Sequence, residues 1–183
     1  RGFKMSIKSV SGNLLFHINT SNTDLKKGDL IHSGKILNPL FKQFYQNDIL
    51  LNGYHKNIHE YINYYWHFTR ETIFEDIRKK YFPHLPSRKK CLFLCDEKNV
   101  DYWINAKITS ENYNILLLKV FGEIFKADTL FIDQTIPNYS NYLPNLAYVE
   151  ECAKDYWSGH IIFSNKVEYL FYGDAEIVDI KKY

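Results

Sequence analysis

The 183-residue sequence lacks several features, and each absence excludes a class of protein. No apolar stretch approaches the roughly 18 residues that a membrane-spanning helix needs, so we expect no membrane as a partner. The three cysteines, Cys91, Cys95 and Cys152, form no CxxC unit with a second CxxC or an HxxxH unit, and we therefore expect no metal site. An odd cysteine count with no recognisable leader is typical of a reducing compartment, which predicts a cytoplasmic protein.

A large excess of charge is also absent. Lysine and arginine total 23 and aspartate and glutamate 21, a net charge of +2, whereas a nucleic-acid-binding domain usually carries a strongly basic face. The basic segment at 86–91 is interpreted as a solvated surface run. The catalytic motifs GxSxG, GxxxxGKS/T, HExxH and GxGxxG are absent too. His55 and His59 could share a metal on a helix, but no third ligand is evident, and an exposed helix is the favoured interpretation.

Aromatic residues, in contrast, are abundant. They make up 17% of the chain, with 15 tyrosines and 13 phenylalanines. Many must pack in a core, and the remainder could line a cleft for a flat ligand. The length suffices for one domain with a substantial core. We expect residues 9–183 to form that domain, and residues 1–8, which include a natural start at Met5, to be an expression remnant and N-terminal tail.

The pattern of apolar residues and turn signals predicts strands early and late in the chain, with most helices between them. Asn38 and Pro39 are expected to begin one helix, and Thr69 to cap another. The predicted helices are 38–45, 58–68, 69–82, 99–108 and 146–159. The predicted strands are 14–18, 90–96, 113–121, 129–133, 160–164 and 167–180, the last broken at Gly173-Asp174. This order favours an α+β fold, with a mostly antiparallel β-sheet and flanking helices, over alternating β-α-β units.

A histidine, His17, ends the first apolar strand, and the chain turns toward water directly after it. The triplet His17-Ile18-Asn19 is followed by the turn Leu-Lys-Lys-Gly-Asp-Leu at 25–30. A lone histidine at a strand end is more often structural than functional. The turn behind it raises the functional interpretation to about equal weight.

Two later segments continue a recognisable pattern in the same order along the chain. They supply Phe93, Cys95, Tyr102, Trp103, Glu168 and Leu170. With the His17 triplet, these segments resemble the ADP-ribosyltransferase fold, and most closely the small rifampin ADP-ribosyltransferase-like group of the His-Tyr-Glu class. That group begins with a strand ending in a His-Gly-Thr-like triplet, followed by a Leu-x-x-Gly-Asp-Leu-like turn. The resemblance implies a split, mostly antiparallel sheet with flanking helices.

The resemblance also implies an NAD-dependent ADP-ribosyltransferase, with NAD as co-substrate. Such an enzyme breaks the bond between ribose and nicotinamide, and positive charge develops on the ribose as in glycoside hydrolysis. Glu168 would stabilise that charge as the catalytic carboxylate, and His17 would bind a ribose hydroxyl. The backbone of Ile18 and Asn19 would hold the carboxamide, while Phe93 would stack on the nicotinamide ring.

Arg88 and Cys95 complete the predicted NAD-binding residues. An extended Pro-Ser-Arg segment leading into strand 90–96 would place the Arg88 guanidinium near the sheet edge, where it could grip a pyrophosphate. A surface ion pair is the competing interpretation of Arg88. Cys95 stands where the group has serine or threonine. The acceptor, whether protein, nucleic acid or small molecule, is not identified by any segment, and the enzyme could serve as a bacterial toxin, effector or defence protein.

Two other functions remain open. Ile18 stands where the group has glycine, and Phe93 where it has tyrosine. Both changes favour a catalytically inactive module that binds a nucleotide-like ligand or a protein partner. An RNA 2′-phosphotransferase-like enzyme would also use NAD but needs several arginines around a phosphate, and only Arg70, Arg78 and Arg88 lie in the body of the chain. NAD binding without turnover would select the inactive module, and turnover that depends on a 2′-phosphorylated RNA end would select the phosphotransferase.

Overall fold

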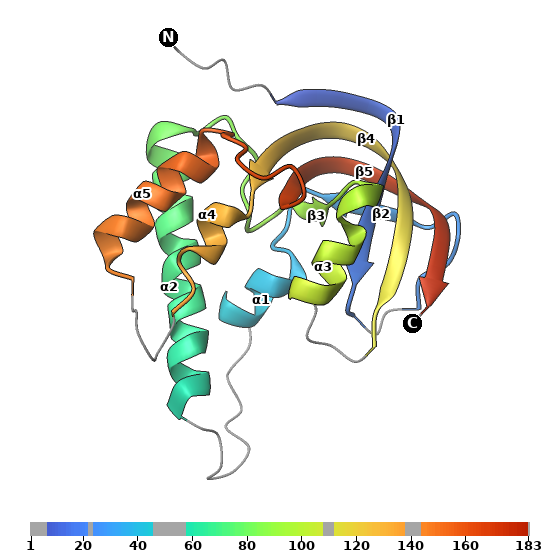
Figure 1. Ribbon diagram of the computed structural model, residues 1–183. Coiled ribbons are helices and arrows are strands. Elements are labelled where there is room, and N and C mark those ends of the chain that lie inside the picture. The colour runs from blue at the N-terminus through green and yellow to red at the C-terminus, as the bar shows by residue number, and fades with distance from the viewer. Residues whose placement is uncertain (1–6, 22–23, 46–57, 108–111, 138–143, 183) are drawn as a thin grey trace.

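The computed structural model describes residues 7–21, 24–45, 58–107, 112–137 and 144–182 of the chain (Figure 1). The strands are β1 (Lys8–Asn19), β2 (Leu30–Ser33), β3 (Leu92–Leu94), β4 (Asn114–Asp128) and β5 (Val167–Lys182). The helices are α1 (Pro39–Tyr45), α2 (Ile58–Tyr81), α3 (Val100–Lys107), α4 (Leu130–Asp133) and α5 (Leu146–Trp157), with a short 3₁₀ helix η1 (Glu97–Asn99). The strand pairs in this part of the chain are all antiparallel, and helices flank the sheet. The predicted fold class, α+β with a mostly antiparallel sheet and flanking helices, is confirmed.

The sheet has the order β1-β4-β5-β2, and β3 also pairs with β5. One edge of β5 pairs with β4 along its length, and the other edge is shared by β3 and then β2. The long strands β1, β4 and β5 curve strongly (Figure 1). The curvature brings the end of β1 back to the end of β3, where Phe16 and Cys95 exchange two backbone hydrogen bonds of 2.9 Å. Strands β1, β4, β5 and β3 therefore close into a ring at this end of the molecule.

The predicted break of the last strand at Gly173-Asp174 is wrong, because β5 runs through it without interruption. Gly173 pairs directly with Gly122 of β4. A Cβ atom on Gly122 would lie 2.1 Å from the Tyr172 carbonyl oxygen, and one on Gly173 would lie 2.3 Å from that of Phe121. The two glycines thus permit a close approach of β4 and β5 that side chains would block, a common role of glycine inside a strand.

Helix α2 is one continuous helix of 24 residues, so Thr69 lies inside it and caps nothing. The segment contains no proline or glycine that would end a helix at its middle. Two other predicted helix ends are confirmed. Asn38 accepts a hydrogen bond from the Phe41 amide at 3.1 Å at the start of α1, and Gly159 adopts a φ of 68° after α5.

The segment 129–133 was expected to be a strand, but it contains the short helix α4. The reason lies in Asp128, which is fully buried and accepts a hydrogen bond from the Leu130 amide at 2.9 Å. This bond turns the chain out of β4 at its last residue. A short apolar run does not by itself distinguish a buried strand from a buried helical turn.

The segment 160–164 was also expected to be a strand, and it forms a loop instead. The second carboxylate oxygen of Asp128 accepts hydrogen bonds from the Ile162 and Phe163 amides, at 2.8 and 2.7 Å. A side chain therefore takes the place of a neighbouring strand as the acceptor for this backbone. Sequence patterning does not reveal such a partner, because it lies more than 30 residues away.

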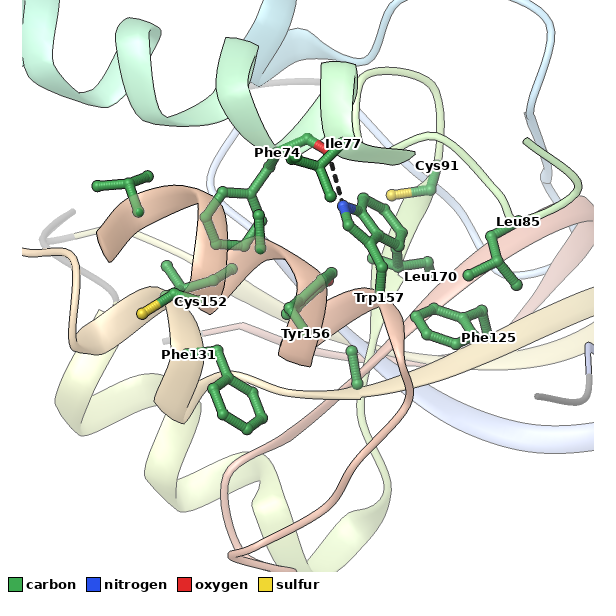
Figure 2. Packing of buried hydrophobic residues seen from close by; sticks show 14 residues of the cluster. Phe74, Ile77, Leu85, Cys91, Phe125, Phe131, Cys152, Tyr156, Trp157 and Leu170 are labelled. Carbon is green, nitrogen blue, oxygen red and sulfur yellow. Dashed lines mark hydrogen bonds between the residues drawn. The ribbon is translucent and has the colours of Figure 1, made fainter. Parts of the chain in front are cut away.

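Two apolar clusters occupy the two faces of the sheet. One cluster lies between the sheet and helices α2 and α5, and its Trp157 donates a hydrogen bond to the Phe74 carbonyl at 2.7 Å (Figure 2). The other cluster includes Leu116, Leu118 and Phe171. Leu170 belongs to the first cluster and the adjacent Phe171 to the second, as expected for alternate residues of a strand. The same alternation directs residue 168 toward the helices.

Candidate functional site

A cavity of about 540 Å³ lies between the end of β1, the start of α1 and strand β3. Its volume lies within the usual range for small-molecule sites, roughly 300–1,000 Å³. Apolar and aromatic side chains form most of its wall, among them Phe16, Leu92 and Trp103. All seven residues predicted for the site line it: His17, Ile18, Asn19, Arg88, Phe93, Cys95 and Glu168. The fold therefore brings together residues from the start, middle and end of the sequence.

His17 lies on β1, and its ring is hydrogen-bonded to the backbone of β3, which also lines the cavity. Its Nδ1 is 2.9 Å from the Phe93 carbonyl oxygen. Because a carbonyl can only accept, Nδ1 carries the proton, and Nε2 of the neutral ring is left as an acceptor. Burial lowers the pKa of the imidazole, and the bond to the Phe93 carbonyl opposes this only in part. The histidine at the end of the first strand is thus held in one neutral form.

Glu168 lies on β5 and is only 2% exposed. Its Oε1 atom accepts hydrogen bonds from Arg88 Nη1 and from the hydroxyl of Tyr156 on α5. Within the described part of the chain no donor binds Oε2. The carboxylate is thus anchored through one oxygen, while the residue as a whole borders the cavity.

Arg88 lies in a turn, and the predicted extended segment is not formed. The amides of Lys90 and Cys91 donate to the Ser87 carbonyl at 3.1 and 3.0 Å, and the turn directs Arg88 inward. The side chain is 7% exposed, so the competing interpretation as a surface ion pair does not describe it. Its Nε and Nη2 donate to the two oxygens of Glu71, at 2.9 and 3.3 Å.

The charges around Arg88 compensate one another. Burial would lower the pKa of Arg88, but the carboxylates of Glu168 and Glu71 raise it well above its usual value. Burial would likewise raise the pKa of Glu71, but the guanidinium groups of Arg88 and Arg70 outweigh it and hold that pKa at about 2. Glu71 and Arg88 therefore stay ionised at neutral pH, and Arg88 is bound by protein carboxylates on both sides.

The sequence-based interpretation missed Glu71 and the hydroxyl of Tyr156. Tyr156 was expected to be a core residue, and its ring does pack in the core, edge-on to Phe74. Burial, opposed by Arg88, raises the pKa of its phenol well above the usual value, so the hydroxyl keeps its proton. Glu71 borders the apolar face of α2. An acidic residue at the edge of a core-facing stripe was the one feature of the sequence that could have indicated a buried glutamate.

A second buried ion pair lies one turn further along α2. Glu75 accepts two hydrogen bonds from Arg78, at 2.8 and 3.1 Å, and one from the Ser87 hydroxyl at 2.8 Å. The remaining nitrogen of Arg78 donates to the carbonyls of Pro83 and Leu85. This pair holds the turn after α2 and does not line the cavity described above.

The other predicted residues fall in or near the same region. Burial, with a smaller contribution from Asp96, raises the pKa of the Cys95 thiol to about 12, so it lines the cavity as a neutral group. Trp103 lines the cavity and donates to the Val167 carbonyl at 3.3 Å. Tyr102 does not line it and instead donates to Asp133 at 3.0 Å.

The remaining expectations concern metals, membranes and unplaced residues. His55 and the side chain of His59 lie outside the described residues, as does the middle of the loop 134–145. Among the residues that the structure does describe, no three histidine, cysteine or acidic side chains are grouped closely enough to hold a metal ion. No helix in this part of the chain combines the length and apolar character needed to cross a membrane.

These features define an α+β fold with a ligand-sized cavity that borders a buried, ion-paired glutamate. The chain belongs to the family described as "Protein of unknown function (DUF2441)", whose profile matches residues 15–183. The matched segment contains every residue of the predicted site, from His17 to Glu168. A search of curated proteins gave no match.

Proposed function

We propose that this chain is an NAD-dependent ADP-ribosyltransferase with Glu168 as its catalytic carboxylate. The observation that best supports the proposal is that seven residues, chosen from separate segments for this chemistry, line one cavity. The wall of that cavity is largely apolar, which suits a planar ring such as nicotinamide. Cys95 fits the site as a neutral, space-filling side chain.

In the proposed reaction, the bond between ribose C1′ and the ring nitrogen of nicotinamide breaks. The electron pair goes to that nitrogen, so nicotinamide leaves as a neutral molecule while positive charge develops on the ribose. Glu168 Oε2 would stabilise this charge, and a nucleophile of the acceptor, or water, then adds to C1′ and loses a proton. His17 Nε2 would accept a hydrogen bond from a ribose hydroxyl, and Phe93 would stack on the nicotinamide. Ile18 and Asn19 would hold the carboxamide through their backbone.

The test is release of nicotinamide from labelled NAD, with and without cell lysate. We expect release by the wild type and at least a 100-fold loss in Glu168→Gln, which keeps the size and hydrogen-bond acceptor of the side chain. Glu75→Gln is the matched control, because it changes a second buried carboxylate outside the cavity, and it should keep full activity. Labelled bands in lysate would indicate a protein or nucleic-acid acceptor. Absence of release from millimolar NAD would contradict the proposal.

A second candidate is a catalytically inactive module that binds a nucleotide-like ligand in the same cavity. It is favoured by the ion pair of Glu168, because a carboxylate already paired with Arg88 presents less net charge to a ribose cation. Stabilisation by NAD without nicotinamide release would select this candidate. Ligand at 100 times its dissociation constant would raise the free energy of unfolding by about 2.7 kcal/mol.

The RNA 2′-phosphotransferase-like alternative receives no support from the arginines. Arg88 and Arg70 bind Glu71, and Arg78 binds Glu75, all in buried ion pairs. An RNA phosphate would therefore have to displace protein carboxylates to reach them. We do not propose this function.

A further inference from the structure

Three buried side chains behind Glu168 form a connected polar network. They come from three places in the chain: Glu71 from α2, Arg88 from the turn before β3, and Tyr156 from α5. All three side chains are nearly inaccessible to solvent. They converge on Glu168 of β5, so two helices and a turn contribute to holding one carboxylate.

The direction of each hydrogen bond follows from the chemistry of the groups. Arg88 Nη1 lies 2.6 Å from the Tyr156 hydroxyl oxygen, and a guanidinium can only donate. The phenol oxygen therefore accepts from Arg88, and its own proton is directed to Glu168 Oε1. Arg88 Nη1 donates to the same Oε1 atom. Two donors on one oxygen restrict the rotation of the carboxylate and leave the other oxygen unoccupied.

Glu71 in turn fixes the orientation of Arg88. Its two oxygens accept from Nε and Nη2, which is the bidentate arrangement that holds a guanidinium plane most firmly. Arg70 also donates to Glu71, at 3.0 Å. Because Arg88 is held along one edge by Glu71, its remaining edge is directed at Glu168 and Tyr156.

We propose that Glu71, Arg88 and Tyr156 are positioning residues, which orient the Glu168 carboxylate so that Oε1 is bound to protein and Oε2 is presented to the cavity. Arg88 in this arrangement serves Glu168 and does not clamp the pyrophosphate of NAD. The claim that these residues orient Glu168 does not depend on the proposed reaction. The claim that this orientation affects turnover rests on the proposed function.

The structural test compares crystal structures of the wild type, Tyr156→Phe and Tyr172→Phe. Tyr156→Phe removes one donor to Glu168 and keeps the buried ring. Tyr172→Phe is the matched control, because its hydroxyl also binds a buried polar group, the Ser87 amide, but not Glu168. We expect the Glu168 carboxylate to rotate in Tyr156→Phe and to stay in place in the control. An unchanged carboxylate in Tyr156→Phe overturns the proposal.

The kinetic test separates positioning from a general loss of structure. In Tyr156→Phe and Glu71→Gln we expect kcat for nicotinamide release to fall about 10- to 100-fold, because small displacements of a catalytic group are costly. KM for NAD should change less than about twofold, since neither residue is placed in contact with NAD in the proposed reaction. Glu75→Gln and Tyr172→Phe should keep both constants. Wild-type kcat in Tyr156→Phe and Glu71→Gln overturns the proposal.

The two proposals fail in different ways. If the wild type releases no nicotinamide, the proposed function fails, and the crystal structures alone decide whether the network orients Glu168. If the wild type is active and Glu168→Gln is not, but the network variants keep full kcat, the proposed function stands and the positioning proposal is rejected.

Discussion

Helix α2 carries two buried glutamates one turn apart, and they are used in different ways. Glu71 binds Arg88 and through it reaches Glu168 and the cavity. Glu75 binds Arg78 and Ser87, which hold the turn that follows the helix. Both pairs are bidentate and almost inaccessible to solvent. A bidentate ion pair therefore does not by itself reveal whether it serves the cavity or only the fold. That role depends on which groups the remaining nitrogen of the arginine contacts.

The two arginines also complete their hydrogen bonding with different kinds of acceptor. Arg78 completes its hydrogen bonding with backbone carbonyls, which are fixed acceptors of a turn. Arg88 completes its bonding with the Glu168 carboxylate and the Tyr156 phenol. The Arg88 network thus concentrates two carboxylates and a guanidinium beside a cavity, an arrangement typical of functional sites.

The largest expected effect on stability is that of Arg88→Met. This change leaves two buried carboxylates, Glu71 and Glu168, without their shared partner, and we expect it to cost about 3–5 kcal/mol. Arg78→Met should cost less, because only Glu75 loses its partner and the Ser87 hydroxyl still donates to it. Urea unfolding of the two variants measures the difference. Equal losses would show that the two pairs are energetically alike.

An intermediate effect on the free energy of unfolding is expected when the pH is lowered. The pKa of Glu71 is about 2 in the folded protein, below its value of 4.5 without such contacts. A lowered folded-state pKa stabilises the protein above pH 4.5, and this stabilisation is lost as the pH falls from about 4.5 to about 2. The difference corresponds to about 3 kcal/mol. Glu71→Gln should be less stable than the wild type at pH 7, and the gap should narrow in urea unfolding at lower pH; a constant gap would contradict the assignment.

The smallest effect is expected from Ser87→Ala. The Ser87 hydroxyl donates to Glu75 at 2.8 Å, and loss of this one bond should cost about 1 kcal/mol. Because the bond belongs to the pair that holds the turn, nicotinamide release should not change. Thermal unfolding and the release assay test both expectations. A marked loss of release would show that the two glutamate networks are functionally connected.

Part of the fold and the site could be predicted from the sequence. Helix ends could be predicted where the residues that cause them are close in the chain. Asn38 at the start of α1 and Gly159 after α5 are examples. The resemblance to the ADP-ribosyltransferase group led to the choice of His17, Phe93 and Glu168 as members of one site. All three line the same cavity.

Two of the errors, in the segment 160–164 and at Arg88, arose because the partner is distant in sequence. Asp128 holds the segment 160–164 as a loop through hydrogen bonds to the amides of Ile162 and Phe163, which no local pattern records. Arg88 gave the appearance of an accessible cation because Glu71 lies 17 residues before it and Glu168 lies 80 residues after it.

The sequence by itself determined the class of fold and most helices, and it indicated seven of the residues that border the cavity. Apolar periodicity and capping act over a few residues, so these features follow from neighbouring positions. Only the tertiary structure decided the continuous course of β5, the neutral form of His17 and the ion pair of Glu168 with Arg88. Each depends on groups brought together across the sheet, where burial strengthens an ion pair and leaves an unpaired charge costly.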